Sequence, residues 1–509
     1  MNRYVAAFAL SLLVVVLLQW RGNAFAAEFA SNEDEPAHYV TGLMVHDYLT
    51  QGFPSNPLEF AREFYARYPK VALGHWPPVF YFLQAVWTSL FTESRTSLLL
   101  LMAVISAAAL TLTFAIAARF FGTWLALGGT VVLAATPGFQ EFSRSIMTDM
   151  LVTLLGLISV VLLARHIEWN RWSTGLWFGV IAAGAIMTKA TGIAIAPVPL
   201  LAVLLLGRYE RLRDLRFWLP ALVVAAICIP WFLLAPDALH ESVARFGGPR
   251  MLRFRLLDSA RYWIQALGPI GAPLAAIGMA RTVQSLFRKQ ELDPIWLLML
   301  LVLPVTIAFR MGILVWSTPY MVTTLPILTL FFCSGLAWLL KAALPSAKMQ
   351  GIVAGILLSV IIFRNVNAIA PKPHLGLDKV ALDIVRNSAF ANAPLLILSD
   401  ARGEGAFIAE VAGGEQRPGH KIERGSKLLS SLNWMGRQYG LRFKTRDELT
   451  SFLTSHPGLL VVLDTPEYSF GHVDQVRSAV AAEPDRWEVV GTYGGWQGDV
   501  RVLRLRKPA

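Results

Sequence analysis

Residues 3–39, RYVAAFALSLLVVVLLQWRGNAFAAEFASNEDEPAHY, pass from a long apolar segment into three consecutive acids. An apolar run of this length is typical of a transmembrane helix, which needs roughly 17–25 residues to cross a bilayer. Glu33, Asp34 and Glu35 would then lie where the chain leaves the membrane. Charge at such a position is costly and usually serves a function, so this junction indicates both the fold class and a candidate site.

Apolar runs of similar length recur as far as about residue 365. The protein has 509 residues, 55% of them hydrophobic and 16% charged, whereas soluble domains carry about 25% charged residues. We therefore predict a polytopic α-helical membrane protein with about eleven spans, within a range of about ten to thirteen. The predicted membrane domain covers residues 1–370, with amphipathic juxtamembrane helices in an outer loop at 21–95. Residues 371–509 are predicted to form a soluble α/β domain.

The spans after the first are predicted at 97–118, 122–140, 149–164, 174–188, 190–206, 217–235, 262–280, 294–309, 318–340 and 349–365. Arginines cluster at 208–216, which places that loop in the cytoplasm under the positive-inside rule. The acids and the C-terminal domain then face the outer side of the membrane. The same rule accounts for the net charge of +11 without a nucleic-acid partner. A cleaved signal peptide is the alternative reading of the first segment.

The acids at 33–35 have three interpretations. A carboxylate such as Asp34 would act as a base that removes a proton from an acceptor hydroxyl. Capping of the next helix would explain one acid, because carboxylates are favoured at helix N-termini. A metal site formed by Asp34 and His38, which share a helix face at i and i+4, is the third.

Further ionisable residues border the later apolar runs. Arg144 and Asp149 precede one run, where they would pair with each other, cap the helix or serve a site. Lys189 stands between two runs, either as a snorkelling side chain or as a point charge for a lipid phosphate. A predicted outer loop carries four arginines, which would bind a phosphorylated donor or anionic lipid in general: Arg245, Arg250, Arg253 and Arg255.

These motifs together resemble those of the GT-C class of membrane glycosyltransferases. The matching segments are "DEPAHY" at 34–39, "HWPPVFY" at 75–81, "SRSIMTDMLV" at 143–152, "MTKATG" at 187–192 and "STPYMVTTLPIL" at 317–328. More narrowly, the chain is similar to the family 39-like group of protein O-mannosyltransferases, aminoarabinose lipid A transferases and rhizobial galacturonosyltransferases. Trp76 and Ala190 depart from the common pattern, and the C-terminal domain matches no β-trefoil.

The resemblance implies a GT-C fold and inverting sugar transfer from a polyprenyl-phosphate-linked donor. It also implies a bacterial inner membrane, with the active site and the C-terminal domain on the periplasmic side. The acceptor would be a hydroxyl of a glycolipid such as lipid A, a polysaccharide or a protein, and membrane lipids would surround the enzyme. Asp34, Glu35 and Asp149 would be catalytic, and donor phosphate would contact Lys189, Arg144, Arg245, Arg250 and Arg253. The roles of His38, His75 and Tyr320 stay open, as does a divalent cation, since no residue set demands one.

Two other classes of function compete with the enzyme. A transporter or flippase would move a lipid-linked sugar without forming a bond, and would also use basic residues for the carrier. Transporters often contain internal repeats, which are not visible in this sequence. A non-catalytic scaffold, in which the acids only cap helices, is the other alternative. Nucleotide-driven pumping is disfavoured because the sequence has no Walker A motif.

Overall fold

The structure is a computed structural model. It describes residues 2–29, 32–71, 74, 76–235, 249–288, 290–311, 319–391, 393–431, 438–456, 458–466, 470–495 and 497–506. The chain divides into two compact units. We call Met1–Gly22, Gly74–Phe80 and Leu100–Ala370 the helical unit, and Asn23–Leu73, Tyr81–Leu99 and Pro371–Ala509 the sheet unit.

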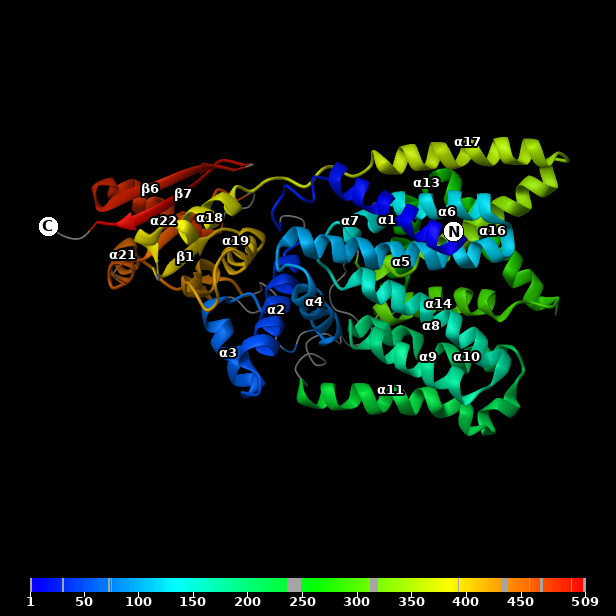
Figure 1. The fold of residues 1–509 in the computed structure, drawn as a ribbon. Helices are drawn as coiled ribbons and strands as arrows, with labels where there is room; N and C mark the ends of the chain where they lie inside the picture. Colours follow the sequence, from blue (N-terminus) through cyan, green and yellow to red (C-terminus); the bar gives the residue numbers. More distant parts are fainter. Residues whose placement is uncertain are drawn as a thin grey trace. The chain divides into compact units, whose positions relative to one another are not determined.

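Long apolar helices make up the helical unit (Figure 1). The described helices are α1 (Arg3–Arg21), α5 (Arg95–Phe121), α6 (Thr123–Ala135), α7 (Pro137–Ser143), α8 (Asp149–Trp169), α9 (Trp172–Ile186), η2 (Ala190–Ile195), α10 (Val198–Leu205), η3 (Tyr209–Arg213), α11 (Leu215–Leu234), α13 (Pro249–Phe287), α14 (Pro294–Met311), α15 (Pro319–Val322), α16 (Leu325–Ala343) and α17 (Ala347–Val366). The predicted polytopic helical fold is thereby confirmed, and each predicted span contains one or two of these elements.

Among the described residues, seven helices are long and apolar enough to cross a membrane: α1, α5, α8, α11, α13, α16 and α17. Four predicted spans instead contain shorter apolar helices, namely α6, α9, the segment Ala190–Leu205 and α14. Length and composition alone therefore do not fix the predicted number of about eleven spans. Helix α17 keeps large apolar side chains such as Ile356 and Phe363 exposed, as expected for a lipid-facing helix.

Helices α13 and α16 cross at very close range in the helical unit. A Cβ atom on Gly278 would lie 2.1 Å from the Phe331 carbonyl oxygen, and one on Gly335 would lie 1.9 Å from that of Leu274. Such spacing is below van der Waals contact, so this crossing requires glycine on both helices. Small residues at helix crossings are common in membranes, where dispersion contacts between closely packed backbones hold helices together.

The C-terminal part of the sheet unit is the predicted α/β domain. Its five strands, in the spatial order β2-β1-β5-β7-β6, are β1 (Leu395–Leu398), β2 (Ile422–Arg424), β5 (Leu460–Leu463), β6 (Trp487–Gly494) and β7 (Asp499–Leu505). β1 runs parallel to β2 and β5, and β7 pairs antiparallel with β5 and β6. Strands β3 (Ser430–Ser431) and β4 (Gly440–Leu441) form a separate pair.

Helices cover this sheet and bury its apolar side chains. They are α18 (Leu377–Arg386), η4 (Ser388–Phe390), α19 (Ala401–Gly414), α20 (Gly425–Leu428), α21 (Arg446–Thr454), α22 (Gly471–Ala482) and η5 (Pro484–Arg486). Leu396 and Leu398 of β1 belong to one core with side chains of α21 and α22. Because side chains alternate along a strand, Leu395 and Ile397 face the opposite side, where α19 contacts β1.

The N-terminal part of the sheet unit contains α2 (Glu35–Asp47), the π-helix η1 (Tyr48–Gly52), α3 (Pro57–Arg67) and most of α4 (Val79–Leu90). Helix α3 is amphipathic, as predicted, with Ala61 and Phe64 buried. Helix α2 differs from the prediction because it is buried on almost every side rather than lying on a surface. The reason is that glycines of α19 pack against it, with Gly405 at Pro36 and Gly413 at Tyr39.

Candidate active site

Asp34 occupies the N-cap position of α2, where a carboxylate would ordinarily accept hydrogen bonds from the first helical amides. Its side chain makes no such capping bond, although its own backbone N–H donates to Asn32 Oδ1 at 2.9 Å. Pro36 in the first turn also lacks an N–H to be capped. Asp34 is half-buried and Glu33 is exposed. The capping interpretation therefore does not account for the Asp34 carboxylate.

Glu35 is completely buried and forms an ion pair with Lys372. Lys372 Nζ lies 3.1 Å from Oε2 and 3.3 Å from Oε1, and the Lys372 side chain is also buried. The pair joins the start of α2 to the segment that follows α17, across 337 positions in sequence. Such a fully enclosed carboxylate is well placed to hold the Asp34 turn in position, and its two oxygens already have a cationic partner.

Two side chains from other segments share the surroundings of Asp34. The His38 Nδ1 atom lies 2.8 Å from the Tyr81 hydroxyl, with both residues buried, and the Asp34 charge acts on that hydroxyl. Lys70 follows α3 and feels the charges of Glu33 and Asp34. Burial, together with the nearby Arg424, lowers the pKa of Lys70 to about 8. An ammonium group that interacts with the Asp34 carboxylate is therefore present near neutral pH.

In the helical unit, Asp149 and Lys189 form a buried ion pair. Lys189 Nζ lies 2.8 Å from Asp149 Oδ1 and 3.0 Å from Oδ2. Asp149 is the first residue of α8, and Lys189 precedes η2. Neither Thr148 nor Lys189 caps the following helix through its side chain. The partner of Asp149 in this pair is thus Lys189, and not Arg144 as one interpretation of the sequence had it.

Arg144 instead fixes the ends of two helices. Its guanidinium donates to the Ala370 carbonyl at 2.9 Å and to Gly22 at 3.5 Å, and it pairs with Glu141 at 2.8 Å. Gly22 follows α1 and Ala370 follows α17. These contacts hold the guanidinium against backbone oxygens of the helical unit and against the Glu141 carboxylate.

The structure describes the side chains of only some of the remaining predicted site residues. Arg253 is exposed and Arg255 is buried, with its guanidinium 5.9 Å from the Phe254 ring centroid. Arg245 and His75 lie outside the described residues, and the side chains of Arg250 in α13 and Tyr320 in α15 are likewise outside the description.

The helical unit contains an apolar groove, some of whose wall residues neighbour Asp149 and Lys189 in sequence. Its empty volume is about 680 Å³, open space at its mouth included, and its walls come from α8, η2, α14 and the start of α16. Val152 lies one helical turn after Asp149, and Thr191 lies two residues after Lys189. The apolar groove and the charged pair are thus close neighbours along α8 and η2, a combination that suits a molecule with an anionic head and an apolar tail.

Two groups of described side chains have the composition of a cation site. One comprises Glu28, His374 and Asp378, and the other comprises His46, Asp47 and Glu93. Neither includes Asp34 or His38, the pair considered from the sequence. Arg417 already binds Asp47 through Nε at 2.6 Å and Glu93 through Nη2 at 2.6 Å, so a cation there would compete with a guanidinium.

Sequence reasoning missed three residues near the acids: Lys70, Tyr81 and Lys372. Tyr81 lies within the "HWPPVFY" segment, so that motif was a signal for it, whereas Lys70 lies outside the segment and no motif marked it. Lys372 stands in the short polar stretch "APKPHLG", whose composition indicates only a linker. Its approach to Glu35 depends on tertiary structure.

Comparisons with known proteins identify a matching family and solved structures with the same fold. The model of the dolichyl-phosphate-mannose-protein mannosyltransferase family matches residues 75–233. No curated protein sequence matches significantly. Crystal structures of ArnT from Cupriavidus metallidurans share the fold. The form bound to undecaprenyl phosphate has a TM-score of 0.62 at 13% sequence identity, and the match covers 99% of this chain and 98% of that one. The apo form gives a TM-score of 0.63 at 14% identity, with 98% of each chain covered.

The oligosaccharyltransferase of Archaeoglobus fulgidus, in complex with Zn and sulfate, is also similar. Its TM-score is 0.58 at 12% identity, over 90% of this chain and 67% of that one. The predicted resemblance to GT-C glycosyltransferases is confirmed by the family match and by this shared fold. The GT-C fold with a C-terminal sheet-containing domain is confirmed as well.

Proposed function

We propose that this chain, which has the fold of the GT-C membrane glycosyltransferases, moves a sugar from a polyprenyl-phosphate-linked donor to a hydroxyl of an acceptor. The observation that carries the proposal is the apolar groove whose walls include Val152, one helical turn after Asp149, and Thr191, two residues after Lys189; these two charged residues form a buried ion pair. A polyprenyl chain would lie in the groove, and its phosphate would meet the Lys189 ammonium. The ArnT crystal structure with undecaprenyl phosphate supports this class of donor, because that protein shares the fold.

The chemistry requires a base and a cation. The acceptor oxygen attacks the anomeric carbon while the bond from that carbon to the phosphate oxygen breaks, so the sugar is transferred with inversion. Asp34 takes the proton of the hydroxyl, since its carboxylate is not used for helix capping. Lys189 stabilises the charge that develops on the leaving phosphate, and Asp149 holds its ammonium in place.

The roles of the other predicted residues follow from their contacts. Glu35 positions the Asp34 turn through Lys372, and Lys70 supplies a further cation beside Asp34. We retain Arg253 as a donor-phosphate ligand together with Arg245 and Arg250, and we give Arg144 a structural role because backbone oxygens engage it. His38 and Tyr81 orient one another beside the base.

The proposed setting is the inner membrane of a bacterium, with the reaction on the periplasmic side. The support for this is the concentration of arginines at 208–216, which the positive-inside rule assigns to the cytoplasm. The acceptor is a hydroxyl of a glycolipid, a polysaccharide or a protein. We propose no obligate cofactor. In an alternative form of this mechanism, a divalent cation would bind both a carboxylate of the site and the donor phosphate. Measuring transfer after chelation of divalent cations tests that alternative.

Replacement of Asp34 by Asn tests the base. Asparagine keeps the shape and polarity of the side chain but cannot take the proton, so transfer should fall about 10²–10⁴-fold. The assay uses protein reconstituted in liposomes with undecaprenyl-phosphate-linked hexoses and pentoses, and total cell-envelope glycolipid as acceptor. Glu33→Gln is the matched control because Glu33 is exposed beside Asp34. Unchanged transfer by the Asn variant would overturn the assignment, and carrier movement without any transfer by the native chain would favour a flippase.

Replacement of Lys189 by Ala tests the donor contact. Donor binding should weaken more than acceptor binding, and equal effects on both would count against the role. The single change leaves the Asp149 charge buried without this partner, which by itself destabilises a fold. The double variant Lys189→Ala/Asp149→Asn removes that charge and separates loss of binding from loss of folding. Binding of undecaprenyl phosphate is the measurement, with Lys341→Ala as the control at an exposed lysine.

A further inference from the structure

The sheet of the C-terminal domain contains a topological switch point between β1 and β5. From β1 the chain passes through α19 to β2, which lies on one side of β1. From β5 it passes through α22 toward β6 and β7, which lie on the other side. The two parallel strands therefore send their following loops in opposite directions. In open α/β sheets, ligands bind in the crevice that such divergent loops leave at the carboxyl ends of the strands.

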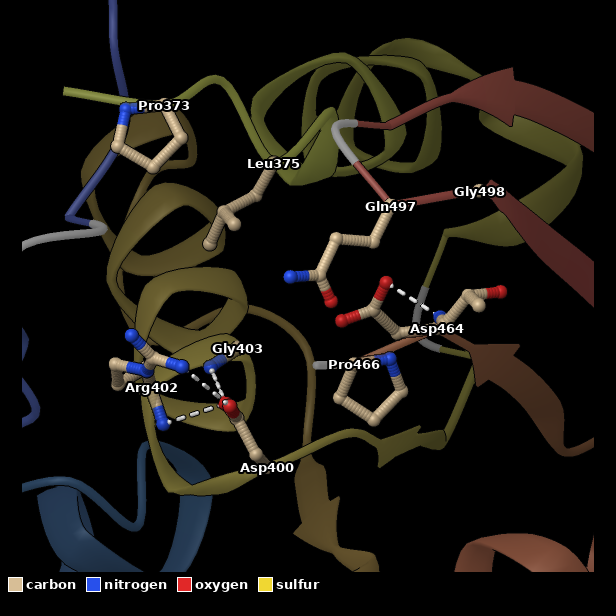
Figure 2. A pocket seen from close by; sticks show the side chains of 10 residues that line it. Pro373, Leu375, Asp400, Arg402, Gly403, Asp464, Pro466, Gln497 and Gly498 are labelled. Atoms are coloured by element: carbon tan, nitrogen blue, oxygen red, sulfur yellow. Dashed lines mark hydrogen bonds and ion pairs between the residues drawn. The ribbon is translucent and has the colours of Figure 1, made fainter. Parts of the chain in front are cut away.

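This sheet has a crevice at that position, with an empty volume of about 430 Å³ that includes open space at its mouth. Figure 2 shows the Asp464 carboxylate and the Gln497 amide on one side of it, and Asp400 with Arg402 on the other. Leu375 and Pro466 supply apolar surface. A small space with apolar walls and a few convergent polar groups is the usual form of a ligand site.

The two carboxylates are held rigidly by neighbouring donors. Asp464 Oδ2 accepts from the Ser399 hydroxyl at 2.5 Å, and Oδ1 accepts from the Thr465 N–H at 2.7 Å. Asp400 Oδ1 accepts from the N–H groups of Arg402 and Gly403 at 2.9 and 2.8 Å. Fixed acceptors of this kind keep lone pairs for a ligand without further ordering cost. The Gln497 amide forms no hydrogen bond with the described residues, so its donors and acceptor are open to a ligand.

The same contacts decide what kind of ligand fits. In nucleotide-binding α/β folds, a phosphate occupies the N-terminus of the helix that follows the first strand. Here the Asp400 carboxylate already fills that position at the start of α19. A second carboxylate, Asp464, faces the same space, and Arg402 is paired with Asp400 at 3.3 Å. The crevice therefore repels phosphates and acidic sugars, whereas carboxylate and amide groups suit hydroxyls and amines.

The wall of the crevice also adjoins the segment that carries Asp34. Lys70 Nζ donates to the carbonyl oxygen of Ala401, the residue after Asp400, at 3.4 Å. Lys372, the partner of Glu35, directly precedes Pro373, which lines the crevice. All of these residues belong to the sheet unit. The loop that carries Lys372, Pro373 and Leu375 therefore both lines the crevice and binds Glu35 at the start of α2.

We propose that this crevice is a subsite for a sugar residue of the acceptor, and that the sugar is either neutral or bears an amine. The proposal rests on the proposed sugar transfer. Asp400 and Asp464 accept hydrogen bonds from sugar hydroxyls, or pair with a sugar ammonium, and the Gln497 amide donates to a hydroxyl or ring oxygen. Leu375 and Pro466 contact the apolar face of the ring. The subsite excludes phosphate groups and uronic acids.

Sugar binding to the full chain tests this proposal. The probes are D-galactose and D-glucosamine, measured by saturation-transfer NMR on the purified protein in lipid nanodiscs. Asp400→Asn keeps a good N-cap residue while removing the charge, and Gln497→Ala removes the amide at an exposed position. Each change should weaken sugar binding about three- to tenfold, the range expected for one lost hydrogen bond. Asp485→Asn and Gln416→Ala, exposed residues outside the crevice, serve as matched controls and should leave binding unchanged.

Three results would overturn the subsite. They are equal sugar affinity in the crevice variants and their controls, displacement of the sugar by inorganic phosphate, and D-galacturonate binding as tightly as D-galactose. Failure of the proposed function would look different, since the native chain would then transfer no sugar while sugar affinity still depended on Asp400 and Gln497. In the transfer assay, the crevice variants should raise the KM for acceptor with little change in kcat, whereas a defect in the base lowers kcat.

Discussion

Lys70 illustrates how burial controls the charge of a single residue. Its pKa is lowered to about 8 from a usual value near 10.5, first by burial and then by Arg424, while Glu33, Asp34 and Glu404 act in the opposite direction. The folded chain therefore releases this proton at lower pH than the unfolded chain does. Between about pH 8 and 10.5 the unfolded state binds more protons, so stability rises with pH in that window. The cation itself is lost as pH rises through 8.

A pH profile of transfer should reveal the charge of Lys70. If this cation assists the reaction beside Asp34, the rate should fall as pH rises through about 8, since the ammonium then loses its proton. Lys70→Arg keeps the charge at all accessible pH values, because a guanidinium stays protonated. The variant should extend activity to higher pH, as measured by initial rates from about pH 6 to 10. Identical profiles for the native chain and the Arg variant would show that another group titrates.

At the scale of elements, close approach of backbones decides which helices pack. Sequence patterns predicted α13 and α16 as spans but gave no sign that they cross at Gly278 and Gly335. A Cβ atom on either glycine would meet a backbone carbonyl oxygen at about 2 Å, and a backbone cannot swing away as a flexible side chain can. The crossing therefore has little tolerance for any side chain.

Gly335→Ala should destabilise the helical unit even though alanine favours helix formation. The added methyl group must push α16 away from the Leu274 carbonyl, and overpacking of this kind costs about 1–3 kcal/mol. Gly351→Ala is the control, because a Cβ atom at Gly351 of α17 would have no neighbour within 4 Å. Thermal unfolding in detergent is the measurement. Equal melting temperatures for the two variants would contradict the described crossing.

At the scale of the whole molecule, the Glu35–Lys372 pair joins segments 337 positions apart within the sheet unit. Removing one partner would leave a buried charge without its counter-ion, which costs about 3–5 kcal/mol. Glu35→Gln and Lys372→Met should each destabilise the chain strongly, whereas Glu35→Leu/Lys372→Met should be far less harmful. A double-mutant cycle on unfolding free energies measures this coupling. Full stability of Glu35→Gln with loss of transfer would instead identify Glu35 as a catalytic residue.

Membrane orientation is the second property at this scale that an experiment should decide. A cysteine at Leu212 in η3 should resist a membrane-impermeant thiol reagent in intact cells, because the arginines at 208–216 are predicted to lie in the cytoplasm. A cysteine at Ser388, which is exposed in the C-terminal domain, should react. Native Cys228 and Cys333 are buried and should contribute little background. The opposite labelling pattern would place the reaction on the other side of the membrane.

Periodicity and composition sufficed to predict much of this molecule. Apolar runs indicated the order of the membrane helices, since a chain in lipid must satisfy its backbone hydrogen bonds within each helix. Alternating β-like and helical segments indicated the C-terminal α/β domain. The same methods misplaced α2, because "HYVTGLMVHDYL" has the pattern of a surface helix and its burial under α19 depends on a segment about 370 positions later. They also left Lys70 and Lys372 without a role.

The sequence by itself determined the fold class, the resemblance to GT-C glycosyltransferases and the identity of the acids to be tested. These properties depend on local patterns, such as span length, hydropathy and short motifs. Only the tertiary structure decided which charges are partners: Asp149 with Lys189, and Glu35 with Lys372. An ion pair depends on distance in space, and a sequence does not contain that distance. The crevice between β1 and β5 likewise exists only because strand order differs from chain order.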